Sequence, residues 1–179
     1  MCSEKYMHKK PVKKLYEQLT KHSLEDAVDA LWNNILPKYF DDEQYSIVQN
    51  ARPWPGSTKT RADFIIRQVR QDDTERQVVL IENKRAEQES RDSTWRDALG
   101  QLEGYMKTAR AADYVDSAGR YDMFGIVTVG RYSRFYVLHA KSESLVDYGQ
   151  IGGQPLEFKK DEDMIDYMLL ELVRETSAA

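Results

Sequence analysis

Cysteine is almost absent from this chain of 179 residues. Cys2 is the single one, which excludes an internal disulfide framework and any zinc site built on several thiolates. The three histidines, His8, His22 and His139, are scattered along the chain and predict no catalytic dyad. This cysteine usage is typical of an intracellular protein, in the nucleus or the cytoplasm.

Long apolar runs and an excess of positive charge are missing as well. No stretch approaches the roughly 20 apolar residues that span a bilayer, and Met1 to Lys14 lacks the apolar core of a secretion signal, so we expect no membrane partner. The formal net charge is −4, which excludes a protein that coats nucleic acid through overall basicity. A local basic face remains compatible with phosphate binding.

What the sequence does contain is the composition of one soluble domain. Hydrophobic residues make up 41% and charged residues 31%, and this length favours a single compact unit. We expect residues 1–22 to form a basic N-terminal tail that passes into a helix, and residues 23–179 to form the domain. The lysine-rich stretch His8 to Lys14 is compatible with a nuclear-targeting signal or with a solvated tail.

Apolar periodicity predicts the order α-β-β-β-α-β-β-α. The predicted elements are a helix that begins at the N-cap Ser23 and ends at Pro37, strands at Tyr45–Gln49, Ala62–Ile66 and Gln77–Glu82, a helix along Trp95–Met106, strands at Met123–Val129 and Ser133–His139, and a C-terminal helix along Met164–Val173. A hairpin turn is expected at Arg70–Arg76 and a loop at Arg85–Ser93. Three antiparallel strands followed by a crossover helix predict an α/β fold with a mixed sheet flanked by helices.

Chemistry is expected at the ends of the second and third strands. Asp63 lies on the second, and Glu82 and Lys84 follow on the third. Side chains alternate along a strand, so Glu82 and Lys84 share one face, and hairpin pairing would bring Asp63 to Glu82. Two converging carboxylates without histidine or cysteine suit Mg²⁺ or Mn²⁺. Lys84 adds a positive charge for a scissile phosphate or the attacking water.

An ordinary cross-strand charge pair on a solvated face is the alternative interpretation. The run Val78 to Ile81 predicts a strand buried on both faces. Charges at the end of such a strand are costly to desolvate, so they require specific partners or a functional role. This context favours a functional site.

Asp63 and the run Glu82-Asn83-Lys84 resemble the two halves of the signature of the PD-(D/E)XK, or restriction-endonuclease-like, nuclease superfamily. The resemblance covers about Ser23 to Leu138, with the elements in the order of that family's αβββαβ core, and Ala62 stands where the family has proline. It implies an α/β restriction-endonuclease-like fold and metal-dependent hydrolysis of phosphodiester bonds, most simply in DNA. Asp63, Glu82 and the main-chain carbonyl of Asn83 would hold the metal, and Lys84 would orient or activate water.

Two further patterns resemble the RecB-like nucleases and the N-terminal nuclease domain of type I restriction subunits. Gln101 and Tyr105 stand one helical turn apart, as in the Gln-x-x-x-Tyr motif, and Gly125 to Gly130 followed by Arg134 is similar to a glycine-bounded strand pair. The resemblance implies that Gln101 supports the phosphate or Lys84. It also implies a helix-one glutamate in the metal site, for which Glu25 is our choice and Asp29 the second candidate.

A phosphate track is the last expectation. It consists of basic residues that flank the proposed site in the sequence, namely Arg52, Lys59, Arg61, Arg85, Arg91 and Arg96. Arg61, Arg85, Arg96 and Tyr105 are the expected nucleic-acid contacts, although ordinary surface charge explains such residues equally well. A catalytically silent module that binds nucleic acid or protein, a domain that needs a larger chain, and a homodimer or larger assembly all stay open.

Overall fold

The computed structural model describes residues 4–54, 56, 60–112, 121–149 and 153–177. Its helices are α1 (Lys10–Gln18), α2 (Glu25–Ile35), α3 (Asp92–Ala112) and α4 (Glu162–Ser177), with short 3-10 turns η1 (Tyr6–His8), η2 (Leu36–Lys38) and η3 (Ala86–Gln88). Its strands are β1 (Tyr45–Ala51), β2 (Ala62–Val69), β3 (Glu75–Lys84), β4 (Met123–Val129), β5 (Tyr132–Leu138), β6 (Val146–Asp147) and β7 (Leu156–Glu157).

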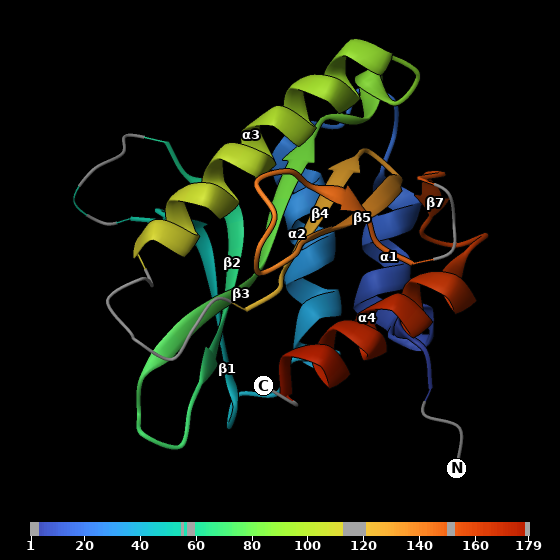
Figure 1. The fold of residues 1–179 in the computed structure, drawn as a ribbon. Helices are drawn as coiled ribbons and strands as arrows, with labels where there is room; N and C mark the ends of the chain where they lie inside the picture. The colour runs from blue at the N-terminus through green and yellow to red at the C-terminus, as the bar shows by residue number, and fades with distance from the viewer. Residues whose placement is uncertain (1–3, 55, 57–59, 113–120, 150–152, 178–179) are drawn as a thin grey trace.

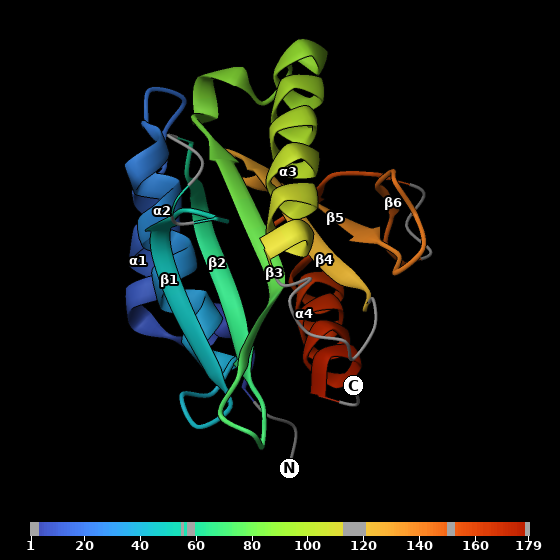
Figure 2. The ribbon, with the colours of Figure 1, turned by 60° about the vertical axis from the view of Figure 1, so that its left-hand side comes forward.

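One mixed sheet of seven strands organises the described residues. The order is β1-β2-β3-β4-β5-β6, and β7 pairs with β5. β3 and β4 are parallel, whereas the other described strand pairs are antiparallel. The parallel pair requires a crossover, which α3 supplies on one face of the sheet. Figures 1 and 2 show α3 alone on that face and α1, α2 and α4 on the other.

The expected α/β class, the mixed sheet flanked by helices and the C-terminal helix are confirmed. β6 and β7 were not predicted, because strands of two residues are too short to show an alternating pattern. Ser23 is not the N-cap of the first predicted helix, since Leu24 occupies that position and the Ser23 hydroxyl instead accepts the N–H of Thr20. None of the helices in the described part of the chain has the length and apolar character needed to cross a bilayer.

Residues 4–22 pack into the same core as the rest of the chain. Tyr6 and Val12 are fully buried and Leu19 is nearly so, and all three belong to the hydrophobic cluster between the sheet, α2 and α4. The Tyr6 hydroxyl donates to the carbonyl of Phe158, far away in the sequence. The expected basic tail therefore contributes a helix and apolar anchors to the domain.

β3 is buried along eight of its ten residues, and it leads directly to the candidate site. Val78 to Ile81 are fully buried because α3 covers one face and α2 lies on the other. The burial continues into the polar end of the strand, where Glu82 is only 4% exposed and Asn83 is fully buried. A carboxylate and an amide in such surroundings require specific partners.

Candidate active site at the ends of β2 and β3

The antiparallel pairing of β2 with β3 brings the two predicted carboxylates together. Phe64 pairs with Ile81, so the next step of the same register sets Asp63 opposite Glu82. Both lie on the face under α3, because Ile65 and Leu80, two residues away on each strand, pack in the cluster beneath that helix. The strands concerned lie side by side in Figure 2.

Lys84 shares this face and pairs with Glu82. Its ammonium donates to Glu82 Oε1 at 2.6 Å, and the two side chains are 17% and 6% exposed. The second oxygen, Glu82 Oε2, is buried and has no hydrogen-bond partner among the described residues. One oxygen of this carboxylate is thus held by a cation, and the other remains available to a ligand.

Asp63 is held in place by the main chain of β3. The N–H of Asn83 donates to Asp63 Oδ2 at 2.6 Å. This bond fixes one oxygen of the carboxylate at the point where the paired strands separate. Asp63 is therefore oriented by the backbone of the segment that carries Glu82 and Lys84.

Asn83 points to the opposite face, where it joins a polar chain that the sequence interpretation missed. Its side-chain amide donates to Asp29 Oδ1 at 2.8 Å. Gln49 donates to Asp29 Oδ2 at 3.4 Å and accepts from Asn33 at 3.0 Å. The alternation of β3 contained the relevant signal, since a buried amide opposite Glu82 and Lys84 needs a polar partner.

Burial raises the pKa values of both carboxylates at the site, and neighbouring negative charges add to the rise. Desolvation, followed by the charge of Glu82, raises the pKa of Asp63 to about 7, and the bond from Asn83 opposes this shift. Desolvation also raises the pKa of Glu82, although Lys84 pulls it down. Carboxylates that share a poorly solvated site and oppose each other in this way favour a bound cation.

Glu25, the first residue of α2, is half-buried near this pair. The charges of Glu25 and Asp29 both act on Glu82 and raise its pKa. The two candidates for a third ligand differ in one respect. Both oxygens of Asp29 are occupied by amide donors, whereas Glu25 forms no hydrogen bond or ion pair with a described residue, so the arrangement favours Glu25.

Tyr105 and Gln101 on α3 have different surroundings. The charges of Glu82 and Asp63 act on the half-buried Tyr105 and, together with desolvation as the largest cause, raise its pKa to about 12. Tyr105 therefore lies near both carboxylates and keeps its proton at neutral pH. Gln101 is exposed one turn earlier on α3 and has no hydrogen bond to a described residue, so the structure does not join it to the pair.

The donor set fits a divalent hard cation in its chemistry. Asp63 and Glu82 supply oxygen ligands, and Glu82 Oε2 is a buried acceptor without a partner. Among the described residues, no group of three or more His, Cys, Asp or Glu side chains is arranged to hold a metal ion. The binding of Mg²⁺ or Mn²⁺ by Asp63, Glu82, the Asn83 carbonyl and Glu25 stays a prediction.

The arginines expected to flank the site lie at the ends of the strands and the helix that carry it. Arg52 follows β1, Arg61 precedes β2, Arg85 follows β3, and Arg91 and Arg96 lie near the start of α3. All five arginines are exposed, and none has an ion pair with a described residue. Because β1, β2 and β3 are antiparallel, these element ends lie at one end of the sheet. Lys59 lies outside the described residues.

Comparisons with protein-family models, with curated proteins and with solved structures found no match for this chain.

Proposed function

We propose that the protein is a metal-dependent nuclease of the PD-(D/E)XK kind that hydrolyses phosphodiester bonds, most simply in DNA. The observation that carries the proposal is the convergence of Asp63, Glu82 and Lys84 at the ends of two paired strands. The succession of α2, three antiparallel strands, α3 and β4 matches the order of a restriction-endonuclease-like core. The exposed arginines at the same end of the sheet support a polyanionic substrate.

The chain's own residues would divide the work of hydrolysis. Asp63 and Glu82 would hold Mg²⁺ or Mn²⁺, which supplies charge stabilisation and lowers the pKa of water. Asn83 orients Asp63 through its N–H, at 2.6 Å. Lys84 is held by Glu82 and offers its remaining protons to the phosphate or to the attacking water. Water would then add to phosphorus as one P–O ester bond breaks, with the water losing a proton to solvent and the leaving oxygen gaining one from it.

Tyr105 and Gln101 would contact the substrate from α3. Tyr105 stays neutral at physiological pH because its pKa is about 12, so its hydroxyl can donate a hydrogen bond to a phosphate oxygen close to the carboxylates. Gln101 is exposed one turn away and would support the phosphate or Lys84. Arg61, Arg85 and Arg96 would position the nucleic-acid backbone on either side.

One observation favours a second candidate, a catalytically silent module that binds nucleic acid or a protein. The bond from Lys84 to Glu82 Oε1, at 2.6 Å, neutralises part of the charge that would attract a cation. In that case the pair stabilises the end of β3 and has no chemical role. Metal binding distinguishes the two candidates.

The test is an incubation of the full chain with supercoiled plasmid, single-stranded DNA and RNA in Mg²⁺ or Mn²⁺. We expect at least one substrate to be cleaved, and Lys84→Ala to abolish the cleavage. Lys107→Ala, which changes an exposed lysine on α3, is the matched control and should leave cleavage unchanged. Cleavage that persists in Lys84→Ala would contradict the assignment, and the absence of both cleavage and calorimetric metal binding would favour the silent module.

A further inference from the structure

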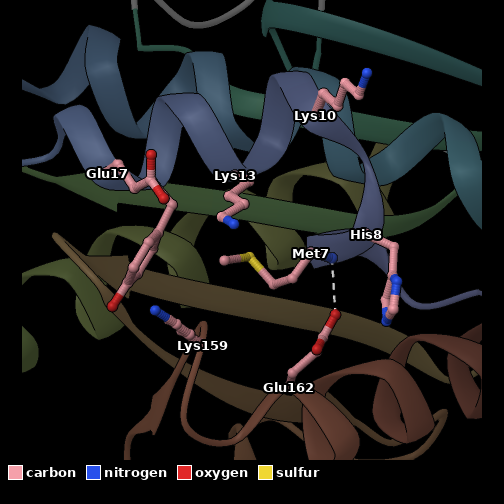
Figure 3. Close-up of a pocket in the computed structure, with 8 residues that line it drawn as sticks. Met7, His8, Lys10, Lys13, Glu17, Lys159 and Glu162 are labelled. Atoms are coloured by element: carbon pink, nitrogen blue, oxygen red, sulfur yellow. Dashed lines mark hydrogen bonds between the residues drawn. The ribbon is translucent and has the colours of Figure 1, made fainter.

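A second concave site lies between η1, α1 and the turn that precedes α4. It has a volume of about 520 Å³ and is lined by Met7, His8, Lys10, Lys13, Tyr16, Glu17, Lys159 and Glu162. None of these residues belongs to the candidate active site. Figure 3 shows that Lys13 from α1 and Lys159 from the turn extend into the space between them, whereas Lys10 points away.

Two ammonium groups thus face one hollow, each without a direct ion pair to a described residue. Lys13 and Lys159 form no ion pair with a described residue, even though Glu17 and Glu162 line the same hollow. One oxygen of Glu162, Oε1, is directed to the main chain, where it accepts the N–H of Met7 at 2.7 Å. Unpaired like charges that converge in a concavity repel each other, and a bound anion would remove that repulsion.

The backbone that carries Lys159 is tied to α1 by hydrogen bonds. Glu157 is only 3% exposed, and its Oε2 accepts the N–H groups of Lys159 at 3.1 Å and Lys160 at 2.7 Å. Its Oε1 accepts the hydroxyl of Tyr16 on α1. A single buried carboxylate therefore ties the turn with Lys159 to the helix with Lys13, and this ordering reduces the entropy that a ligand must overcome.

We propose that this site binds the phosphate group of a small phosphorylated molecule between Lys13 and Lys159. Lysine binds phosphate as a point charge, and two ammonium groups that face one hollow match a group that carries more than one negative charge. The volume lies within the roughly 300–1,000 Å³ of small-molecule sites. Met7 offers an apolar surface for the uncharged part of the ligand. The inference is independent of the proposed nuclease activity.

Isothermal titration calorimetry of the full chain with inorganic phosphate, pyrophosphate and ATP tests this site. We expect one of the three to bind with a stoichiometry of one per chain. Lys13→Gln and Lys159→Gln should each weaken that binding by about tenfold or more, because each removes a charge-assisted hydrogen bond. Lys14→Gln and Lys160→Gln are matched controls, since they remove the neighbouring exposed lysines, which do not line the hollow, and they should bind as the wild type does.

Three results would overturn the proposal. The first is no heat of binding with any of the three anions at millimolar concentration. The second is an equal loss in the control variants, which would show a diffuse charge effect. The third is a short single-stranded oligonucleotide that binds more tightly than ATP and loses affinity in Lys13→Gln and Lys159→Gln, which would assign the site to a nucleic-acid backbone.

Discussion

At the scale of single residues, the candidate site buries two carboxylates whose charged forms are costly to remove from water. Asp63 and Glu82 face each other at the end of a buried strand, and the pKa of Asp63 is raised to about 7, against about 4 for an aspartate in an unfolded chain. Between these two pH values the folded protein keeps a proton that the unfolded chain has lost. The free energy of unfolding of the metal-free protein should therefore fall as the pH rises through this range.

Asp63→Asn should remove the contribution of Asp63 to this pH dependence. The amide oxygen can still accept the N–H of Asn83, but no charge is left to desolvate. At pH 8 in a chelating buffer, we expect the variant to be more stable than the wild type by about 1–3 kcal/mol. Denaturant titration at pH 5 and pH 8 measures the difference. Asp97→Asn, an exposed change on α3, should leave stability unaltered, and an Asp63→Asn variant no more stable than the wild type at pH 8 would contradict the account.

Single residues also show how much of the site could be predicted. Hairpin pairing and strand alternation were enough to predict that Asp63, Glu82 and Lys84 lie together. The chain from Asn83 through Asp29 to Gln49 could not be predicted, because it joins α2, β1 and β3, whose relative positions depend on tertiary packing. Whether these residues bind metal or substrate stays a prediction.

At the scale of elements, α3 is positioned on the sheet by a close approach at Gly125. A Cβ added to Gly125 would lie 2.7 Å from Leu102 Cδ2 and 2.9 Å from Met106 Sδ. The absence of a side chain on β4 thus allows α3 to pack closely, and Tyr105, between those two contacts along the helix, stays near Asp63 and Glu82. The position of a potential substrate contact depends on a glycine one strand away.

Gly125→Ala should force the buried side chains of Leu102 and Met106 to shift under α3. We expect a loss of about 1–3 kcal/mol in the free energy of unfolding, as is usual for overpacked cores, measured by denaturant titration.

Gly104→Ala, on α3 itself, should have the opposite effect, because a Cβ added there would have no atom within 4 Å. It should stabilise by about 0.4–1 kcal/mol through lower chain entropy and better helix propensity. Equal effects of the two changes would contradict the packing argument.

The sequence predicted the long elements well and the short ones poorly. Four helices and five strands are long enough for their apolar residues to show a regular spacing. Part of α1 was nevertheless expected as a tail. β6 and β7 pair only through backbone hydrogen bonds to β5, which leave no side-chain pattern in two residues. The N-cap of α2 was wrongly predicted at Ser23. The Ser23 hydroxyl accepts the N–H of Thr20 in the preceding turn and so does not cap the helix.

At the scale of the whole molecule, the N-terminal segment belongs to the cooperative core. Tyr6 is fully buried and makes an edge-to-face contact with Phe158, at 6.4 Å between ring centroids. Trp32 of α2 packs on the same Phe158 ring at 5.3 Å. The first and last parts of the described chain are therefore joined around one aromatic residue.

Tyr6→Ala should destabilise the entire domain and not only its N-terminus. We expect a loss of about 3–5 kcal/mol, the range for removal of a large buried aromatic side chain. Far-ultraviolet circular dichroism and tryptophan fluorescence should report the same shifted unfolding transition. Tyr167→Ala is the matched control, because Tyr167 is 55% exposed on α4. A separate early transition that involves only the N-terminal segment would contradict a single cooperative unit.

We propose that Asp63, Glu82 and Lys84 form a metal-dependent phosphodiester-cleaving centre. It is tested most directly by the rate of plasmid cleavage as a function of Mg²⁺ concentration in the wild type, in Glu82→Gln and in Glu103→Gln, which changes a carboxylate on α3 outside the site. We predict saturable Mg²⁺ dependence in the wild type and in Glu103→Gln, and a loss of about 100-fold or more in Glu82→Gln, the scale of removing a main electrostatic contribution to catalysis. Cleavage by Glu82→Gln at the wild-type rate would contradict the claim.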